Sequence, residues 1–213
     1  MTFEQILSAI EQAVGEAPQR NFSESVDLAI NLKNIDMSQP TNRIDEEILL
    51  PNGLGKSIKI GVFAKGDIAQ RALDSGAEMI IDPDDIEGLK DDKVKARDLA
   101  NDIDFFISEV AYMPSIAKAL GPVLGPRGKM PVPLTPDKII EDIIRKAKNS
   151  IRVRSKDRLT FHLPVGRKDM EIKLLAENVE AITSRIEQKL ANGKQNIKSI
   201  YIKTTMGPVV KVM

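Results

Sequence analysis

The side chains best suited to chemistry lie near the C-terminus of this 213-residue sequence, in the segment KSIYIKTTMGP. Ile200 and Ile202 alternate there with the polar residues Ser199, Lys203 and Thr205, which predicts a β-strand with one buried and one solvated face. A solvated face that carries hydroxyls, a lysine and a Met-Gly turn suits contact with a nucleic-acid backbone. It does not suit catalysis, because it contains no nucleophile beside a base and no cluster of metal ligands.

Two further features could contact a nucleic acid. Met206 beside Gly207 would let an apolar side chain and bare backbone press closely on a ribose or base, although an ordinary turn at a strand end explains the pair equally well. His162 is the one histidine of the chain and lies in the alternating segment RLTFHLPV. It is expected on the solvated face, as an RNA contact or as a satisfied structural histidine, opposite to Leu159, Phe161 and Leu163.

The composition excludes several classes of site. The absence of cysteine rules out disulfides, thiolate zinc sites and thiol catalysis. A single histidine leaves no catalytic triad and no multi-histidine metal site. We identify no signal peptide and no apolar run approaching about 18 residues. A soluble cytoplasmic protein without a membrane segment, metal or cofactor is therefore expected.

Two glycine-rich segments look like phosphate-binding loops but have the wrong spacing. In GLGKS, the position that should hold the first glycine of the motif is Leu50. In GPVLGPRGKMPVP, Met130 replaces the Ser or Thr that would meet magnesium, and prolines remove backbone donors. We interpret the first segment as a turn or hinge. The second is either a structural turn or a rigid basic loop that contacts RNA or tRNA through Arg127 and Lys129.

The charges balance overall but are segregated along the chain, with 31 basic and 31 acidic residues in total. Residues 151–213 contain 13 basic and 6 acidic residues, so their net charge is +7 and that of residues 1–150 is −7. Residues 74–104 contain 11 acidic and 4 basic residues. We interpret the acidic stretch as solvated surface and the basic C-terminal part as a surface for a polyanion.

Hydrophobic periodicity predicts the elements that must position these residues. A helix capped by Thr2 precedes two strands, in SVDLAINLK and IDEEILLP. After the turn-rich PNGLGK, short apolar strands alternate with helices. The last of these helices is expected to have Thr135 as N-cap, Pro136 at its first position and Ile139 on its apolar face. From Ile151 onward, alternating strands return, and a long helix separates them from the final strand.

This order of elements predicts two domains. The chain ends together supply strands and two helices, which suits an α+β sandwich of one sheet with helices on one face. We expect a discontinuous first domain of residues 1–53 and 151–213, with an α/β domain of residues 54–150 inserted into it. Two chain crossings at one junction would form a hinge.

Several segments also resemble a known family when they are read together. In order and over nearly the whole chain, they resemble the archaeal form of the family of large-subunit ribosomal protein one. The segments that carry this resemblance are FSESVDLAINL, LPNGLGKSIKIGVFAKG, LGPVLGPRGKMPVP, FHLPVGR and SIYIKTTMGP. Proteins of this family form the mobile lateral stalk beside the tRNA exit site. The resemblance implies that the split domain is an RNA-recognition-like sandwich and that the inserted domain is a three-layer Rossmann-like unit.

The resemblance also implies a function without catalysis or cofactors. The expected partners are large-subunit rRNA, exit-site tRNA and the protein's own mRNA, and the free protein is expected to be a monomer of the cytoplasm that joins the ribosome. It would bind rRNA at the stalk, assist the release of deacylated tRNA and repress its own translation. The acidic inserted domain is expected to stay away from the rRNA.

The motif match assigns RNA contacts to both ends of the chain. Position 21 is Asn21, where the bacterial pattern more often has lysine, so no charge contact is expected there. Lys203 and His162 are added because they share the solvated face, and Arg154 and Lys156 because of their charge. The residues that match the family's N-terminal and C-terminal contact strands are Phe22, Glu24, Ser25, Ser199, Thr205, Met206 and Gly207.

Two other classes of function remain open at this point. The inserted α/β unit could belong to an enzyme acting on a nucleotide, which the failed phosphate-loop spacings and the missing acid-base pair disfavour. The protein could also be an interaction module whose acidic patch at residues 82–92 binds a basic partner.

Overall fold

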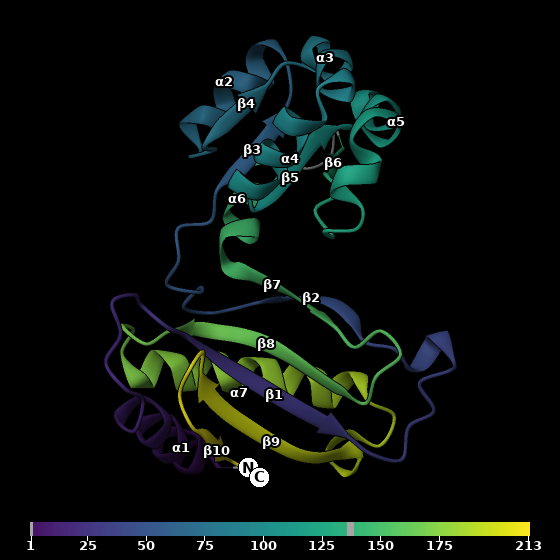
Figure 1. The fold of residues 1–213 in the computed structure, drawn as a ribbon. Helices are drawn as coiled ribbons and strands as arrows, with labels where there is room; N and C mark the ends of the chain where they lie inside the picture. The colour runs from purple at the N-terminus through teal and green to yellow at the C-terminus, as the bar shows by residue number, and fades with distance from the viewer. Residues whose placement is uncertain (1, 136–138) are drawn as a thin grey trace. The chain divides into compact units, whose positions relative to one another are not determined.

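The structure is a computed structural model that describes residues 2–135 and 139–213. It divides into two compact units, which we call unit 1 (Met1–Lys56 with Asn149–Met213) and unit 2 (Ser57–Lys148) (Figure 1). The expected boundaries lie within a few residues of this division. That the two units fold independently stays a prediction.

Unit 1 is built on an antiparallel sheet of four strands in the order β10-β9-β1-β8. Alternate residues of the central strand β1 are buried, as the sequence alternation predicted. A separate antiparallel pair joins β2 to β7. The bounds of these strands are β1 Ser25–Leu32, β2 Asp45–Leu49, β7 Ser150–Arg154, β8 Thr160–Arg167, β9 Ile197–Thr204 and β10 Val209–Lys211.

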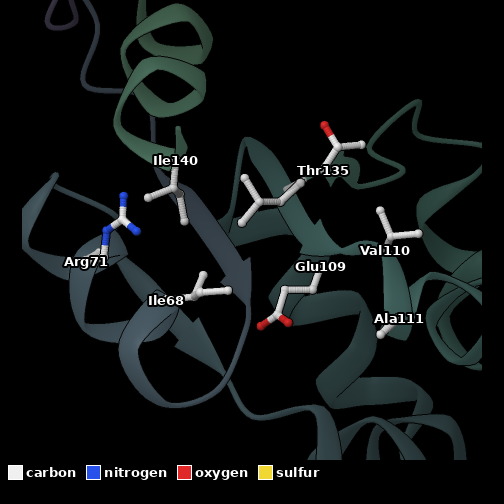
Figure 2. A pocket seen from close by; sticks show the side chains of 8 residues that line it. Ile68, Arg71, Glu109, Val110, Ala111, Thr135 and Ile140 are labelled. Atoms are coloured by element: carbon white, nitrogen blue, oxygen red, sulfur yellow. The ribbon is translucent and has the colours of Figure 1, made fainter. Parts of the chain in front are cut away.

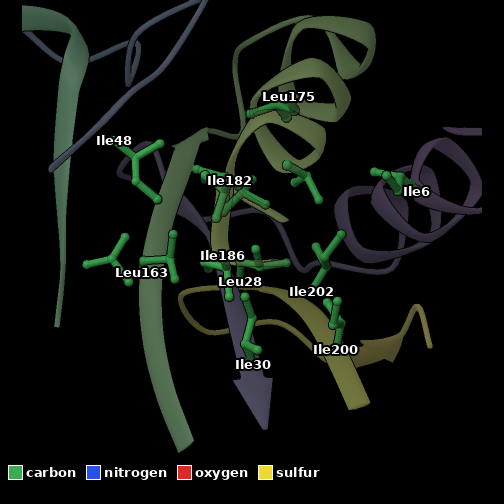
Figure 3. Packing of buried hydrophobic residues seen from close by; sticks show 14 of the residues in the cluster. Ile6, Leu28, Ile30, Ile48, Leu163, Leu175, Ile182, Ile186, Ile200 and Ile202 are labelled. Carbon is green, nitrogen blue, oxygen red and sulfur yellow. The ribbon is translucent and has the colours of Figure 1, made fainter. Parts of the chain in front are cut away.

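Two helices cover the buried face of this sheet. In α1 (Phe3–Gly15), the backbone N–H of Thr2 donates to the Gln5 side chain at 3.0 Å, which confirms the predicted capping box. The longer α7 (Ile172–Lys189) packs beside α1, and a short 3-10 turn, η4 (Gly193–Asn196), leads from it to β9. Figure 3 shows isoleucines and leucines from both helices meeting those of β1, β8 and β9 in one core. Because the helices occupy only this face, the opposite face of the sheet is left for solvent or a partner.

Unit 2 has a parallel sheet in the order β4-β3-β5-β6 with helices on both faces. One apolar cluster joins Phe63 and Phe106 to α3, α4 and α5, and a second joins Ile60 and Ile107 to α2 and α6. This arrangement is the predicted three-layer α/β unit. The bounds are β3 Ile60–Phe63, α2 Gly66–Asp74, β4 Met79–Ile81, α3 Ile86–Asp91, α4 Lys93–Asp102, β5 Phe105–Glu109, α5 Met113–Leu124, β6 Val132–Leu134 and α6 Ile140–Asn149, with 3-10 turns η2 Pro83–Asp85 and η3 Val110–Tyr112. A further 3-10 turn, η1 Pro40–Asn42, lies in unit 1 between β1 and β2.

Two local expectations differ from the structure. The helix that was expected to begin at Pro136 begins at Ile140, and Ile139 is 56% exposed instead of lying on the apolar face; Pro136 itself lies outside the described residues. Leu159, expected beside Phe161 and Leu163 on the buried face, is exposed; it precedes the first residue of β8, and its carbonyl accepts a hydrogen bond from the Leu32 N–H at the sheet end. No helix in the described ranges is long and apolar enough to cross a membrane.

Candidate nucleic-acid interface

The uncovered side of the four-stranded sheet, which we call the outer face, carries most of its polar side chains. Strand register places Ala29 between His162 and Tyr201, and Asp27 between Pro164 and Lys203. His162 is exposed, as the alternation predicted. The outer-face residues are Ser25, Asp27, Ala29 and Asn31 of β1, Thr160, His162 and Pro164 of β8, Ser199, Tyr201 and Lys203 of β9, and Val209 and Lys211 of β10.

A carboxylate lies beside Lys203 and His162 on this face. Burial raises the pKa of the Asp27 carboxyl above its ordinary value, and the nearby Lys203 and His162 oppose that shift. Asp27 therefore offsets part of the positive charge that the outer face could present to a phosphate backbone.

The turn that follows β9, at residues 205–207, is held by a buried acid from the other end of the chain. Glu24 is 1% exposed, and its Oε1 accepts from the Met206 backbone N–H at 2.9 Å and from the Thr204 hydroxyl at 3.5 Å. Its Oε2 is 4.0 Å from Lys168 Nζ and has no hydrogen-bond partner among the described residues. The motif match assigned Glu24 as an RNA contact; in the structure its carboxylate is buried and holds the backbone of the turn, so its part in RNA binding stays a prediction.

Thr205 ties the same turn to the start of β1. Its Oγ1 accepts from the Ser25 backbone N–H at 3.1 Å and donates to the Ser25 carbonyl at 3.3 Å, while its own N–H donates to that carbonyl at 3.0 Å. At Gly207 a side chain has no room, since a Cβ would overlap Thr204 Oγ1 and would lie 3.2 Å from the Ala17 side chain. The structure thus brings Glu24 and Ser25 together with Thr205 and Met206, whereas Ser199 lies opposite Asn31 near the other end of β1.

Two apolar side chains project from this junction. Met206 is 59% exposed and Phe22, in the segment before β1, is 55% exposed. Large exposed apolar side chains beside polar backbone groups can pack against a flat or ridged binding partner. Phe22, which by composition alone is more often a core residue, belongs with Met206 at the surface.

Ser199 corrects the prediction of a fully solvated polar face. It is only 6% exposed, and its hydroxyl accepts a hydrogen bond from Asn31 Nδ2 at 2.9 Å, while Asn31 Oδ1 accepts from the Thr160 hydroxyl at 2.7 Å. Sequence reasoning missed Asn31 and Thr160, although the polar alternation of SVDLAINLK could have shown Asn31 on this face. The three side chains form a hydrogen-bonded row across β8, β1 and β9.

Arg154 and Lys156 do not lie on the four-stranded sheet. Arg154 belongs to β7 and lies 3.3 Å from Asp45 of the paired strand β2, while Lys156 occupies the turn after β7 with a φ of 52°. Both residues were predicted as RNA contacts by charge alone, and charge does not indicate where in the fold a residue lies.

Arg127 and Lys129, the predicted tRNA-facing cations of unit 2, are largely engaged within that unit. Lys129 Nζ donates to the carbonyls of Ala100 and Ile103 at 2.9 and 2.7 Å, at the end of α4. Arg127 donates to the Val123 carbonyl at 3.1 Å. The loop that follows α5 is therefore fixed by its own cations, which favours the structural-turn reading of GPVLGPRGKMPVP.

The described residues contain no group of three His, Asp or Glu side chains that could hold a metal ion. The arrangement of unit 1 thus offers hydroxyls, amides, cations and two exposed apolar groups on one surface. Such a surface can bind a polar polymer by shape and hydrogen bonding.

Comparison with known proteins assigns the chain to a family. The model of the ribosomal protein L1p/L10e family matches residues 11–208. The chain is 58% identical to large ribosomal subunit protein uL1 of Methanococcoides burtonii and 57% identical to that of Methanocella arvoryzae, over the full length of each. It is 47% identical to the uL1 protein of Archaeoglobus fulgidus over 99% of this chain and 98% of the relative. The chain therefore belongs to the ribosomal protein L1p/L10e family and is a ribosomal protein of the cytoplasm, not an enzyme.

Proposed function

We propose that unit 1 binds structured rRNA of the large subunit through its outer face and the 205–207 turn. The observation that carries this proposal is the convergence of two segments from opposite ends of the chain. Phe22 to Ser25 and Thr205 to Gly207 meet at one end of the sheet, where hydrogen bonds fix them. A rigid junction with exposed apolar side chains suits a fixed RNA shape better than a generic polyanion.

The chemistry divides between affinity and specificity. Lys203 and Lys211 supply counterion release, which strengthens binding to any phosphate backbone. The backbone and apolar side chain of Met206 can approach a ribose closely, and the Ser25 hydroxyl can pair with a 2′-OH, which DNA lacks. Since the Ser199 hydroxyl is engaged by Asn31, its contribution is to orient that amide.

The finer role is proposed from the family resemblance together with this surface. At the lateral stalk, unit 1 would hold rRNA while unit 2 is free to approach exit-site tRNA and assist its release. A stem of similar shape in the protein's own mRNA would compete for the same face, so the free monomer would repress its own translation. The names of the uL1 relatives support the ribosomal assignment, while tRNA and mRNA binding rest on this argument alone.

The first test is a titration of the full chain with a large-subunit rRNA stalk fragment and with a scrambled stem of equal length, at two salt concentrations. Tight binding to the stalk fragment alone is expected. Equal and strongly salt-dependent binding to both RNAs would reduce the surface to a generic polyanion site.

Variants then locate the contact. Met206→Asp is expected to abolish tight binding with little change in stability, because an exposed carboxylate would face the RNA backbone. Met130→Asp, at a 39%-exposed methionine of unit 2, is the matched control and should bind like the wild type. Lys203→Ala should weaken binding and reduce the salt slope by about 1. Wild-type affinity in Met206→Asp would refute the assignment of the turn.

A further inference from the structure

Unit 2 contains a cavity of about 350 Å³ that the RNA-binding surface does not use. It lies at the carboxyl edge of the parallel sheet, beyond the ends of β3, β5 and β6. The chain leaves β3 toward β4 on one side and β5 lies on the other side, so this edge is a topological switch point, where α/β units bind ligands. The size falls in the range of small-molecule sites.

Most of the cavity wall is apolar, with one carboxylate directed into it. The apolar part of the wall comes from Ile68 of α2, Leu134 at the end of β6 and Ile140 of α6, together with Val110 and Ala111, which follow β5. Figure 2 shows the Glu109 carboxylate between these groups, pointing toward Ile68.

The charges at the cavity favour a cation. Arg71 is already neutralised, because its guanidinium binds Glu141 through contacts of 3.1 to 3.2 Å. Within the described residues, the Glu109 carboxylate accepts a single long hydrogen bond, from the Lys65 backbone N–H at 3.4 Å. The lining thus keeps one negative charge whose hydrogen-bonding capacity is mostly unused.

The same contact argues against a nucleotide. In α/β units the phosphate of a nucleotide occupies the amides at the start of the first helix. Here the Lys65 amide, just before α2, is directed at Glu109, and Asp67 adds a second acid in the first turn of that helix. Two carboxylates at this position would repel a phosphate.

We propose that this cavity binds a primary alkylammonium group, with the ammonium on Glu109 and the methylenes along Ile68, Leu134 and Ile140. An ammonium has three donors and forms charge-assisted hydrogen bonds with a carboxylate, while an aliphatic stem matches the apolar wall. A free polyamine and a lysine side chain of a neighbouring protein share this chemistry. The site is independent of the proposed RNA-binding surface, which lies in unit 1.

The test uses the full chain without RNA and follows backbone amide resonances during titration with 1,4-diaminobutane. Saturable shifts at Lys65 and Ala111 are expected. Glu109→Gln should weaken binding by about tenfold or more, because the charged acceptor is lost. Glu78→Gln, at an exposed acid of the same unit outside the cavity, should leave binding unchanged. Ala111→Leu keeps the carboxylate and should also weaken binding by filling the cavity.

The outcomes that overturn the proposal are absence of saturable binding, equal binding in Glu109→Gln and the wild type, or binding of butyrate as tight as that of butylamine. A blocked Ala-Lys-Ala peptide distinguishes the sources. Binding of this peptide would identify a lysine of a partner as the occupant, and binding of diaminobutane alone would identify a free polyamine.

Discussion

At the scale of single residues, Glu24 resolves an apparent conflict between charge and function. A carboxylate on an RNA-binding surface would repel phosphates, yet Glu24 stands in the segment assigned to contact. Its burial removes the conflict, since its Oε1 holds the Met206 amide and its Oε2 lies near Lys168. The sequence could not show that Glu24 holds the backbone of a turn far along the chain, and its part in RNA binding stays a prediction.

Gly207 is required by close packing at the same turn. We expect Gly207→Ala to lower the free energy of unfolding by about 1–3 kcal/mol, because the added methyl overlaps the Thr204 hydroxyl that contacts Glu24. RNA affinity should fall with it. Urea unfolding and RNA titration measure both effects. Gly15→Ala is the control, since nothing lies within 4 Å of its Cβ position at the end of α1, and it should be neutral or slightly stabilising. Equal effects of the two changes would contradict the packing argument.

Asp27 gives the outer face a pH dependence. Burial raises its pKa in the folded state, so the folded protein binds this proton more tightly than the unfolded chain. The ionised carboxylate therefore lowers stability at neutral pH, and this penalty fades as the pH falls through the raised pKa toward the unfolded value of about 3.9. Asp27→Asn should raise the free energy of unfolding at pH 7, with a gain that shrinks in acid.

Urea unfolding at a series of pH values measures that gain. Asp36→Asn is expected to act in the opposite direction, because hydrogen bonds from the Ser38 hydroxyl and backbone lower the pKa of Asp36. Its carboxylate stabilises the fold at neutral pH, and that stabilisation is lost as the pH falls through the lowered pKa. A stabilising Asp36→Asn, or a destabilising Asp27→Asn at pH 7, would refute the sign assigned to each.

At the scale of elements, a buried amide joins three segments of unit 1. Asn178 of α7 is fully buried, and its Nδ2 donates to the carbonyls of Gly53 and Val165 at 2.8 and 2.9 Å. Its Oδ1 accepts from the Asn52 backbone N–H at 3.1 Å. PNGLGK, which fails as a phosphate loop, is thus a turn that docks on α7 and β8.

Asn178→Ala should cost about 2–4 kcal/mol of unfolding free energy, because two buried carbonyls and the part-buried Asn52 N–H lose their hydrogen bonds to Asn178. Denaturant unfolding measures the loss. Thr183→Ala on the same helix is the control and should cost about 1 kcal/mol, since among the described residues the Thr183 hydroxyl bonds to carbonyls of its own helix alone. A similar cost for both would show that Asn178 is not a junction.

Local periodicity was sufficient to predict most elements and insufficient where long-range pairing decides. Alternation predicted β1 and β9 correctly, because one face of each is buried by α1 and α7. It could not predict that Ser199 would be buried and hydrogen-bonded to Asn31, nor that Arg154 would join the separate β2–β7 pair. Those outcomes depend on strand register between segments more than 100 residues apart, which a single sequence does not contain.

At the scale of the whole molecule, folding largely cancels the charge segregation seen along the sequence. Unit 2 contains 16 acidic and 14 basic residues, so its net charge is −2 and that of unit 1 is +2. The acidic N-terminal segment joins the same unit as the basic C-terminal segment. A net charge of −2 is too small to support the expectation that the acidity of the inserted domain keeps it away from the rRNA. RNA affinity must come from the local placement of cations on the outer face.

The two chain crossings between the units suggest a test of where RNA binding lies. At the end of unit 1 the crossing segments are neighbours, since Leu49 pairs with Ser150 and the Leu50 N–H donates to the Asn149 carbonyl at 2.7 Å. A short Gly-Ser linker in place of residues 57–148 would close this gap at little entropic cost. We expect the shortened chain to unfold in one cooperative transition and to bind the rRNA stalk fragment with unchanged affinity.

Circular dichroism in urea and the same RNA titration give two separate readings of this shortened chain. Unit 1 has a buried core of its own, with residues from Ile6 of α1 to Ile202 of β9, and this core should be sufficient for folding. The absence of a cooperative transition would therefore show that unit 1 needs unit 2 to fold. A folded chain with lost affinity would place the decisive contacts in unit 2 and overturn the outer face as the binding surface. Retained folding and affinity together would confine the RNA site to unit 1, where the outer face and the 205–207 turn lie.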